Sequence, residues 1–379
     1  MLYDYESIAA SFTRESLQDK PFDLWRYLPL LPISKPIEGP PAGGTACFQA
    51  PRLAKQWGVR EVWIKNDGTN PSASFKCRAS AVALQWAREN GYPTAAAAST
   101  GNAGAAAAFW AAVLEMPTYV FLPETAPPAK VAQLMACGVE VVMVKGTYDQ
   151  AFDLCAEASK KFNWFNRNTG TNPITREGKK TVSFEIAEQM QWEPPDVVVV
   201  SVGDGNIISG VAKGFDELHR LGWISKKPKL LAVQAEGSAA VTRAWEKGSS
   251  IEPVVANTVA DSISVDLPRD GEAAVRAIRN SDGWAVTVTD EAILQAIPEL
   301  AQKGGVLAEP AASAVCAGMH VAHQAGQLQS DWRVLLLVTG HGLKDIGAMQ
   351  KSVGLPTSIE PSMEALESFL HNSHNPEQE

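Results

Sequence analysis

The sequence has little that would support a metal-cluster, disulfide-linked or nucleic-acid-binding protein. Five cysteines are scattered through 379 residues, and no close pair forms a metal-binding knuckle. Because their number is odd, we expect reduced thiols instead of a disulfide framework, and we expect no metal centre. The net charge is −9 and no long basic run occurs, so we expect no nucleic-acid partner.

Long apolar runs and targeting signals are also lacking. No apolar run approaches the length of a membrane span, and the acidic, polar first residues do not have the pattern of a signal peptide. We therefore expect a cytoplasmic protein with no membrane partner. The hydrophobic content of 45% and the charged content of 20% are typical of a globular protein.

Apolar strand-like runs alternate with segments of helix-forming residues along most of the chain. The clearest strands are expected at residues 61–65, 119–122, 139–144, 196–202 and 334–338. Alternation of this kind predicts α/β architecture, with parallel sheets and right-handed crossovers. Near the start, residues 1–25 predict an entry helix and residues 25–32 a buried extended arm.

A chain of this length is too long for one simple core, so two domains are expected. The smaller domain is predicted over residues 70–164 and is expected to be mobile. The larger domain combines residues 1–69 with 165–350. Residues 351–379 read as a polar tail, with a short helix near 363–370 and a disordered end.

Lys76 is the candidate reactive residue. It ends a polar, turn-rich segment that begins at residue 70, and a helical run follows at residues 78–88. Lys76 is therefore expected at a strand-to-helix junction, where open α/β sheets place ligands. A lysine at the start of a helix is electrostatically unfavourable, because it meets the positive end of the helix dipole. Since a lone lysine is usually a solvated surface residue, its role depends on the rest of the chain.

Three other segments of small polar residues each follow a predicted strand. The loop at residues 203–206 combines close backbone approach with a helix start, which suits a phosphate, although a simple tight turn is an equal alternative. Residues 99–104 could bind a carboxylate or could simply begin a helix. Thr339 places a hydroxyl at the end of a core strand.

Together these parts supply the amine, the phosphate site, the anion site and the hydroxyl that pyridoxal phosphate needs. The chain resembles the fold type II pyridoxal-phosphate enzymes and, within them, the threonine synthases. The similar stretches follow the family's order from about residue 24 to residue 350. They are WRY at 25–27, NPSASFK at 70–76, STGNA at 99–103, NPITREGKKT at 172–181, AEPA at 308–311 and TGHGLKD at 339–345.

The resemblance implies two domains, each an open and mostly parallel sheet flanked by helices, with pyridoxal 5'-phosphate as the cofactor. Lys76 would form the Schiff base with the cofactor and later move protons. The other implied cofactor-binding residues are Phe75, Asn102, Gly203, Asp204, Gly205, Asn206, Glu309 and Thr339. Asn102 would face the phenolic oxygen and Thr339 the ring nitrogen. The implied substrate-binding residues are Ser74, Ser99, Thr100, Ala103, Asn172, Thr175 and Arg176.

The implied reaction is elimination of phosphate from O-phospho-L-homoserine and addition of water to give L-threonine. The partner would be this small amino acid, and a homodimer is expected because many relatives are dimers. A second possibility is another lyase or β-replacement enzyme of the same fold, such as a serine or threonine ammonia-lyase or an enzyme similar to cysteate synthase. A third is a catalytically silent relative, which the retained lysine disfavours.

The chain departs from the family at several positions. Cys77 replaces an aspartate, and a small packing residue is a better interpretation than a reactive thiol. Asp204 lies in a shortened phosphate loop, where we expect its carboxylate to brace the loop. Thr175 stands where the family has a substrate-phosphate arginine, and Arg176 follows one residue late, so the resemblance leaves recognition of a phosphorylated substrate open.

Two further residues near the expected site have competing interpretations. Glu309 either lies beside the cofactor ring or caps a helix. His341 stands between two glycines after a core strand, so a structural hydrogen bond is at least as good an interpretation as acid–base chemistry.

Overall fold

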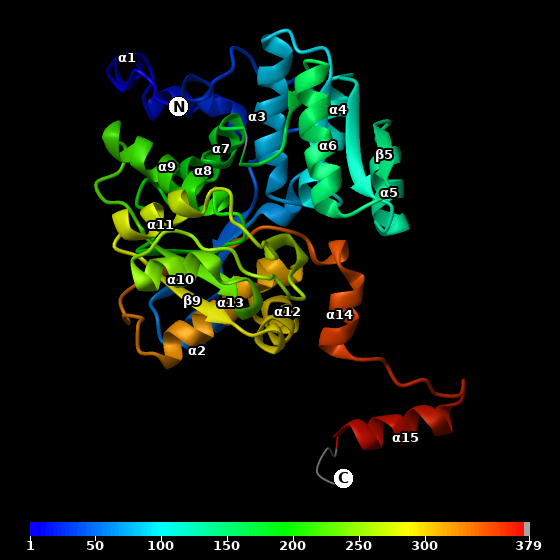
Figure 1. Ribbon diagram of the computed structural model, residues 1–379. Coiled ribbons are helices and arrows are strands. Elements are labelled where there is room, and N and C mark those ends of the chain that lie inside the picture. Colours follow the sequence, from blue (N-terminus) through cyan, green and yellow to red (C-terminus); the bar gives the residue numbers. More distant parts are fainter. Residues whose placement is uncertain (171, 375–379) are drawn as a thin grey trace.

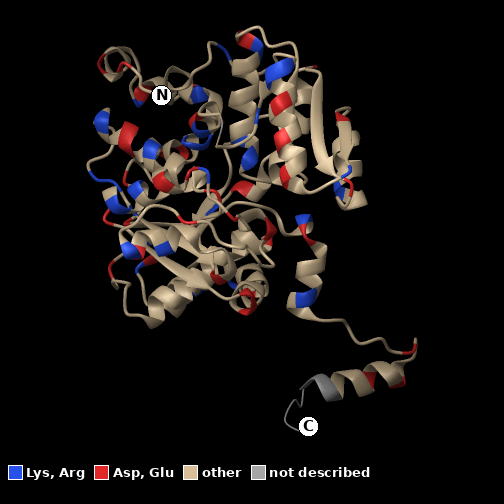
Figure 2. Cartoon of the chain, in the orientation of Figure 1, with Lys and Arg blue, Asp and Glu red and all other residues tan. Residues whose placement is uncertain are grey.

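The computed structural model describes residues 1–170 and 172–374 of the chain. Two β-sheets, each flanked by helices, form its two lobes (Figure 1). The α/β fold class predicted from the sequence is confirmed. Basic and acidic residues are interspersed over both lobes (Figure 2). Among the helices that the structure describes, none combines the length and the apolar character that crossing a membrane requires.

The larger sheet has six strands in the order β1-β2-β10-β7-β8-β9. Their bounds are β1 (Cys47–Gln49), β2 (Glu61–Asn66), β7 (Val197–Ser201), β8 (Lys229–Ala235), β9 (Trp284–Val288) and β10 (Arg333–Val338). Only the edge strand β1 runs antiparallel to its neighbour; the other pairs are parallel. Because helices cover both faces, a central strand such as β7 is buried at every position and is apolar up to its last residue, Ser201.

The smaller sheet has four parallel strands in the order β5-β4-β3-β6. They are β3 (Ala95–Ala98), β4 (Thr118–Pro123), β5 (Glu140–Val144) and β6 (Phe165–Asn166). Strand β6 pairs with β3, so the chain leaves this sheet after residue 166. The division into domains at residue 164 stays a prediction.

The helices that connect the strands account for the rest of the two lobes. They are α1 (Tyr5–Ser11), α2 (Pro51–Trp57), α3 (Lys76–Glu89), α4 (Asn102–Val113), α5 (Pro128–Met135), α6 (Tyr148–Lys161), α7 (Ile174–Lys179), α8 (Thr181–Gln189), α9 (Asn206–Arg220), α10 (Ala240–Lys247), α11 (Gly271–Asn280), α12 (Asp290–Gly304), α13 (Pro310–Gln324), α14 (Ile346–Val353) and α15 (Met363–His374). Short 3₁₀ helices cover Glu15–Leu17, Leu24–Leu30, Asp67–Thr69, Glu236–Ser238, Asp261–Ile263 and Gly342–Lys344.

The predicted N-terminal helix over residues 1–25 is wrong. No continuous helix forms there: α1 ends where Phe12 takes an extended conformation, and a separate short 3₁₀ helix follows at Glu15–Leu17. The predicted extended arm at 25–32 is wrong as well, because Asp23 accepts a hydrogen bond from the Trp25 amide and starts the 3₁₀ helix Leu24–Leu30. Proline spacing suggested an extended chain, but capping and burial of Leu24 decided the outcome.

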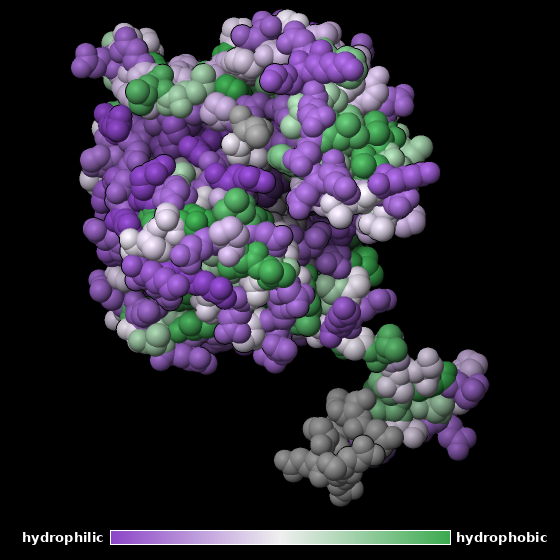
Figure 3. All heavy atoms as spheres, in the orientation of Figure 1, coloured by the Kyte–Doolittle hydropathy of each residue, from purple (hydrophilic) through white to green (hydrophobic). Residues whose placement is uncertain are grey.

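At the other end, the predicted tail helix is confirmed as α15. It stands apart from both lobes (Figure 1 and Figure 3). Its exposed apolar side chains include Met363 and Leu370. The predicted disordered end at residues 375–379 lies outside the described residues.

A buried network of four charges fixes the start of α3. Arg78 donates to Asp67 at 2.6 Å and to Glu185 at 2.5 Å, and the Lys65 Nζ donates to Glu185 at 2.7 Å. All four side chains are completely buried, and two positive charges balance two negative ones. Because Asp67 follows β2 and Glu185 lies on α8, the network ties α3 to the larger sheet.

We expect Glu185→Gln to lower the free energy of unfolding by about 3–5 kcal/mol, because it leaves a buried cation without its counterion. Urea denaturation at pH 7 measures this loss. The matched control is Asp216→Asn, which removes a carboxylate from an exposed pair with Lys227 and should cost less than about 1 kcal/mol. An equal effect of the two changes would show that the network is not a main source of stability.

The same network predicts a pH dependence. Burial raises the pKa of Glu185, but Arg78 and Lys65 more than offset this and hold the pKa at about 2, against a usual 4.5. A lowered pKa in the folded state means that the stabilisation is complete above pH 4.5 and is lost as the pH falls toward 2. Glu185→Gln should flatten the stability curve across this window.

Candidate active site

Lys76 lies at the carboxyl edge of the six-stranded sheet, as predicted. The Phe75 amide donates to the Thr339 carbonyl at 2.8 Å, and Ser74 forms a β-bridge with Gly340. These contacts join the segment before α3 to the end of β10. Lys76 therefore begins α3 beside the loop that follows a central strand, the position at which open α/β sheets bind ligands.

The Lys76 amine has no hydrogen bond or ion pair within the described part of the chain. Its pKa is lowered, chiefly because the side chain is shielded from water and secondly because the Arg167 cation lies nearby; Glu309 and Asp204 oppose the shift. A lowered pKa leaves more of the amine neutral near pH 7. Lys76 is thus prepared to act as a nucleophile and as a base.

The loop at residues 203–206 requires glycine at positions 203 and 205. A Cβ at Gly203 would lie 2.8 Å from the Ile263 Cα, and Gly205 has a φ of +88° that glycine adopts without strain. Asn206 then begins α9, so the positive end of this helix faces the cavity beside Lys76. This geometry suits a phosphate.

Asp204 lines the cavity and connects this loop to residues 269 and 270. Its carboxylate accepts a hydrogen bond from the Arg269 amide at 2.6 Å, and its carbonyl accepts one from the Asp270 amide at 2.9 Å. The interpretation of Asp204 as a bracing residue is confirmed by these bonds. Burial raises the pKa of its carboxyl, and the hydrogen bond from the Arg269 amide opposes this shift.

Lys179 is a cavity residue that the sequence reasoning missed. Its buried amine donates to the Asn206 side chain and lines the cavity that contains Lys76. Burial lowers its pKa well below the usual value, and the Lys76 and Arg167 cations lower it further. The neighbouring Lys180 instead pairs with two glutamates. The two adjacent lysines were the available signal, but only the tertiary structure shows which one faces the cavity.

The opposite wall of the cavity is built from Asn102, Glu309 and Thr339. The Asn102 amide donates to Glu309 at 2.8 Å, and burial raises the pKa of the Glu309 carboxyl. Glu309 occupies the position before α13, yet its side chain does not cap that helix. A Cβ at Gly340 would lie 2.2 Å from the Glu309 carboxylate, so a side chain at 340 would displace it.

A larger cleft opens beside the cavity and shares Lys76 and Asn102 with it. Ser99, Thr100 and Ala103 line this cleft. A Cβ at position 104 would lie 2.0 Å from the Ser99 carbonyl, so glycine is needed for the turn that starts α4. The predicted carboxylate loop is therefore placed facing Lys76, with the first turn of α4 directed toward the cleft.

Five of the predicted residues do not line the cavity or this cleft. Phe75 packs into the core of the larger sheet, and the Ser74 hydroxyl is buried beside it without a hydrogen bond. The other three are Asn172, Thr175 and Arg176.

The side chains of these three residues form hydrogen bonds and an ion pair that stabilise the structure around them. The Asn172 side chain bonds to the Asn166 carbonyl, and the buried Thr175 hydroxyl donates to the Asn172 carbonyl at 2.9 Å. Arg176 pairs with Asp270. None of the three residues lines the cavity or the cleft, and their role in substrate binding stays a prediction.

Two neighbouring residues behave as interpreted from the sequence. Cys77 is buried in the core of the smaller lobe and accepts a hydrogen bond from the Trp110 indole at 3.1 Å, so it is a packing residue. Burial raises the pKa of its thiol. The His341 Nδ1 accepts a hydrogen bond from the Leu343 amide at 3.1 Å, which agrees with the structural one of its two interpretations.

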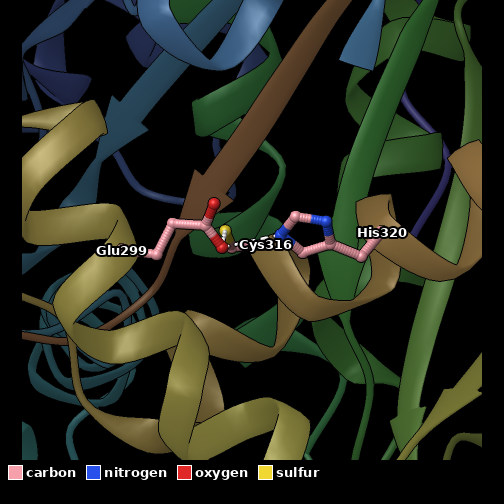
Figure 4. Close-up of side chains that lie close together, drawn as sticks. All are labelled: Glu299, Cys316 and His320. Carbon is pink, nitrogen blue, oxygen red and sulfur yellow. Dashed lines mark hydrogen bonds and ion pairs between the residues drawn. The ribbon is translucent and has the colours of Figure 1, made fainter. Parts of the chain in front are cut away.

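A cluster of Glu299, Cys316 and His320 lies elsewhere, on α12 and α13 (Figure 4). The side chains of this cluster are already hydrogen-bonded. The His320 Nε2 lies 2.6 Å from the Glu299 carboxylate, and the Lys303 amine donates a hydrogen bond to the same carboxylate at 3.0 Å. Burial raises the pKa of Glu299, but these bonds and one from Gln56 lower it to about 2. The cluster is a hydrogen-bonded ion pair and belongs to the packing of the two helices.

The donor set of the cavity fits a phosphate-bearing aldehyde cofactor. Lys76 offers an unbonded amine for an aldehyde, and Lys179 with the loop at 203–206 offers a cation and backbone amides for a phosphate. Thr339 lines the same cavity and carries a hydroxyl. No acidic side chain forms an ion pair with either lysine in the described residues, so an anionic ligand would complete the charge balance.

Comparison with known proteins gives a consistent result. A family model described as pyridoxal-phosphate dependent enzyme matches residues 39–340. The chain is 36% identical over 375 residues to the threonine synthase of Methanocaldococcus jannaschii, covering 98% of this chain and 92% of that one. It is 35% identical over 369 residues to the threonine synthase of Methanosarcina acetivorans, covering 97% and 90%.

Solved structures share the fold at lower identity. An L-serine ammonia-lyase from Rhizomucor miehei is similar with a TM-score of 0.71 and 20% identity, covering 81% of this chain and 96% of that one. A threonine deaminase isoform from Solanum lycopersicum is similar with a TM-score of 0.69 and 23% identity, covering 82% and 84%.

We expect Lys179→Met to weaken binding of pyridoxal phosphate roughly 10-fold or more, since a charge-assisted hydrogen bond to phosphate is lost. Equilibrium titration followed by absorbance measures this. The cofactor-free variant should melt at a temperature equal to or above that of the parent, because an unpaired buried cation is removed. This advantage should shrink as the pH rises toward 10.5, the usual pKa of lysine.

The control for this change is Lys180→Met. Lys180 is paired with Glu177 and Glu217, so its removal should destabilise the cofactor-free fold. Unchanged cofactor affinity in Lys179→Met would refute the phosphate role of this lysine.

Proposed function

Because the chain belongs to the pyridoxal-phosphate dependent enzymes, we propose that it is a threonine synthase, which converts O-phospho-L-homoserine and water to L-threonine and phosphate. The observation that carries the proposal is the unpartnered amine of Lys76, which stands between a phosphate loop and a carboxylate loop. Two threonine synthases similar over nearly the whole chain support it.

When bound, pyridoxal phosphate supplies an electron sink for carbanions next to the substrate nitrogen. The loop at residues 203–206 and Lys179 hold the phosphate end in place. The turn at Ser99 and Thr100 orients the substrate carboxylate, and this fixes which hydrogens face Lys76. Lys76 moves protons one at a time: it takes protons from the α and β carbons as phosphate leaves the γ carbon, and it returns protons to the γ and α carbons while water adds its hydroxyl at the β carbon and gives its other proton to the released phosphate. A single positioned base can reach these neighbouring carbons.

Asn102 and Thr339 set how strongly the cofactor ring withdraws electrons, through its phenolic oxygen and its ring nitrogen. The Asn102 amide, shared with Glu309, offers a donor to the phenolic oxygen. Thr339 offers a neutral hydroxyl to the ring nitrogen, which leaves the ring a weaker electron sink than a carboxylate partner would. A weaker sink favours elimination and replacement over transamination.

We also propose a cytoplasmic location.

A second candidate function is ammonia release from serine or threonine. Thr175 favours it, because the family arginine for the substrate phosphate is absent at this position and Arg176 is engaged by Asp270. The structural similarity to an L-serine ammonia-lyase concerns the fold alone, at 20% identity.

The deciding experiment supplies the cofactor-loaded protein with O-phospho-L-homoserine, L-serine or L-threonine, and measures phosphate, threonine, ammonia and oxo acid. We expect threonine and phosphate in equal amounts from O-phospho-L-homoserine, and no turnover by Lys76→Ala. Ammonia from serine or threonine, without phosphate release from O-phospho-L-homoserine, would establish the second function.

We propose a homodimer, supported by the exposed apolar side chains of α15. Replacing Met363, Leu366 and Leu370 together by serine should give a monomer in light scattering coupled to gel filtration. A parent protein that already has the mass of one chain would overturn this proposal.

A further inference from the structure

Arg167 is a buried guanidinium that the mechanism above does not use. It follows β6, is 1% exposed, and forms no ion pair within the described part of the chain. Its Nε donates to the Ser80 hydroxyl at 3.0 Å and its Nη1 to the Thr169 hydroxyl at 3.5 Å, but its Nη2 has no hydrogen-bond partner. Burial lowers the pKa of Arg167 to about 10.

A buried cation with an unused donor is costly unless a ligand completes it. Arg78 differs from Arg167 in this respect. It is equally buried, but Asp67 and Glu185 neutralise its charge. Nothing comparable faces Arg167 among the described residues. The site is therefore electrostatically incomplete without an anion.

The position of Arg167 selects between the possible anions. It lines the substrate cleft with Ser99, Thr100 and Lys76, whereas the cavity with the phosphate loop contains Lys179 instead. The cofactor phosphate therefore has its own cation. The substrate carboxylate has the first turn of α4, which leaves Arg167 for a second anionic group on the substrate.

We propose that Arg167 binds the anionic substituent at the far end of the substrate side chain. If the proposed function holds, on which this inference rests, that substituent is the phosphate of O-phospho-L-homoserine. Arg167 then supplies, from another position of the same segment, a charge that Thr175 does not. Its fork of donors suits phosphate, and the bonds to Ser80 and Thr169 hold the guanidinium in one orientation.

Exposed acidic side chains at the mouth of the cleft oppose entry of an anion. Asp149 and Asp153 of α6 and Asp266 line it. These carboxylates are in contact with water, where charges are strongly screened. Arg167 is buried, so water and salt screen its charge much less. Its attraction for the anionic group of the substrate therefore outweighs the repulsion from the exposed carboxylates.

The test measures binding to the cofactor-loaded protein by calorimetry and by the cofactor absorbance. Two probes differ only in their distal group: 2-amino-5-phosphonopentanoate carries a phosphonate, and L-norvaline carries none. We expect Arg167→Gln to weaken phosphonate binding roughly 30-fold or more and to change norvaline binding less than about twofold. Arg167→Lys should be intermediate, because it keeps the charge but loses the fork.

Arg269→Gln is the matched control, since it removes an exposed arginine from the rim of the same cleft. It should change binding of either probe less than about twofold. Melting temperatures of the variants identify any that fail to fold, and Arg167→Lys then carries the test.

Each outcome has one meaning. Equal weakening of both probes would assign Arg167 to the substrate carboxylate and overturn the inference. Unchanged phosphonate binding in Arg167→Gln would overturn it as well. A parent protein that binds the phosphonate through Arg167 but makes no threonine from O-phospho-L-homoserine would leave the inference standing and reject the proposed function.

Discussion

The structure depends on how its buried charges are balanced around the first turn of α3. Arg78 and Lys65 are neutralised by Asp67 and Glu185 in a fully buried network. Removing any one of the four would leave an unpaired charge far from water, which is the costly case. This constraint holds α3 against the larger sheet and fixes the direction in which Lys76, two residues earlier, enters the cavity.

Around this balanced network stand three cations that are not balanced. Lys179 and Arg167 are buried and Lys76 is half-buried; all three have lowered pKa values and form no ion pair within the described residues. Holding all three in the charged form without a counterion is costly, and an anionic ligand offsets this cost. Arg78 and Lys65 therefore stabilise the fold, whereas Lys76, Lys179 and Arg167 are available to bind anionic ligands. The burial of a side chain alone does not distinguish these two groups.

At two positions near the site, only glycine leaves enough space for a neighbouring group. Side chains at 104 and 340 would collide with the Ser99 carbonyl and the Glu309 carboxylate. The first contact shapes a loop of the smaller lobe and the second a loop of the larger lobe, and Lys76 shares a pocket with residues of each. Such a site requires the tertiary structure to align segments that lie more than 200 residues apart, as the Asn102–Glu309 hydrogen bond does.

The sequence by itself determined the α/β class, the strand-to-helix junction at Lys76 and the loops at 99–103, 203–206 and 339, because periodicity and small polar residues are local signals. It failed for the N-terminal segment, where capping by Asp23 and burial overrode the pattern of prolines. Only the tertiary structure decided which charged side chains lack partners. Arg78, Arg167 and Arg176 look alike in sequence, but the first is neutralised in the core, the second faces the cleft and the third pairs with Asp270. Charge balance is set by neighbours from distant segments, so no local pattern could have assigned it.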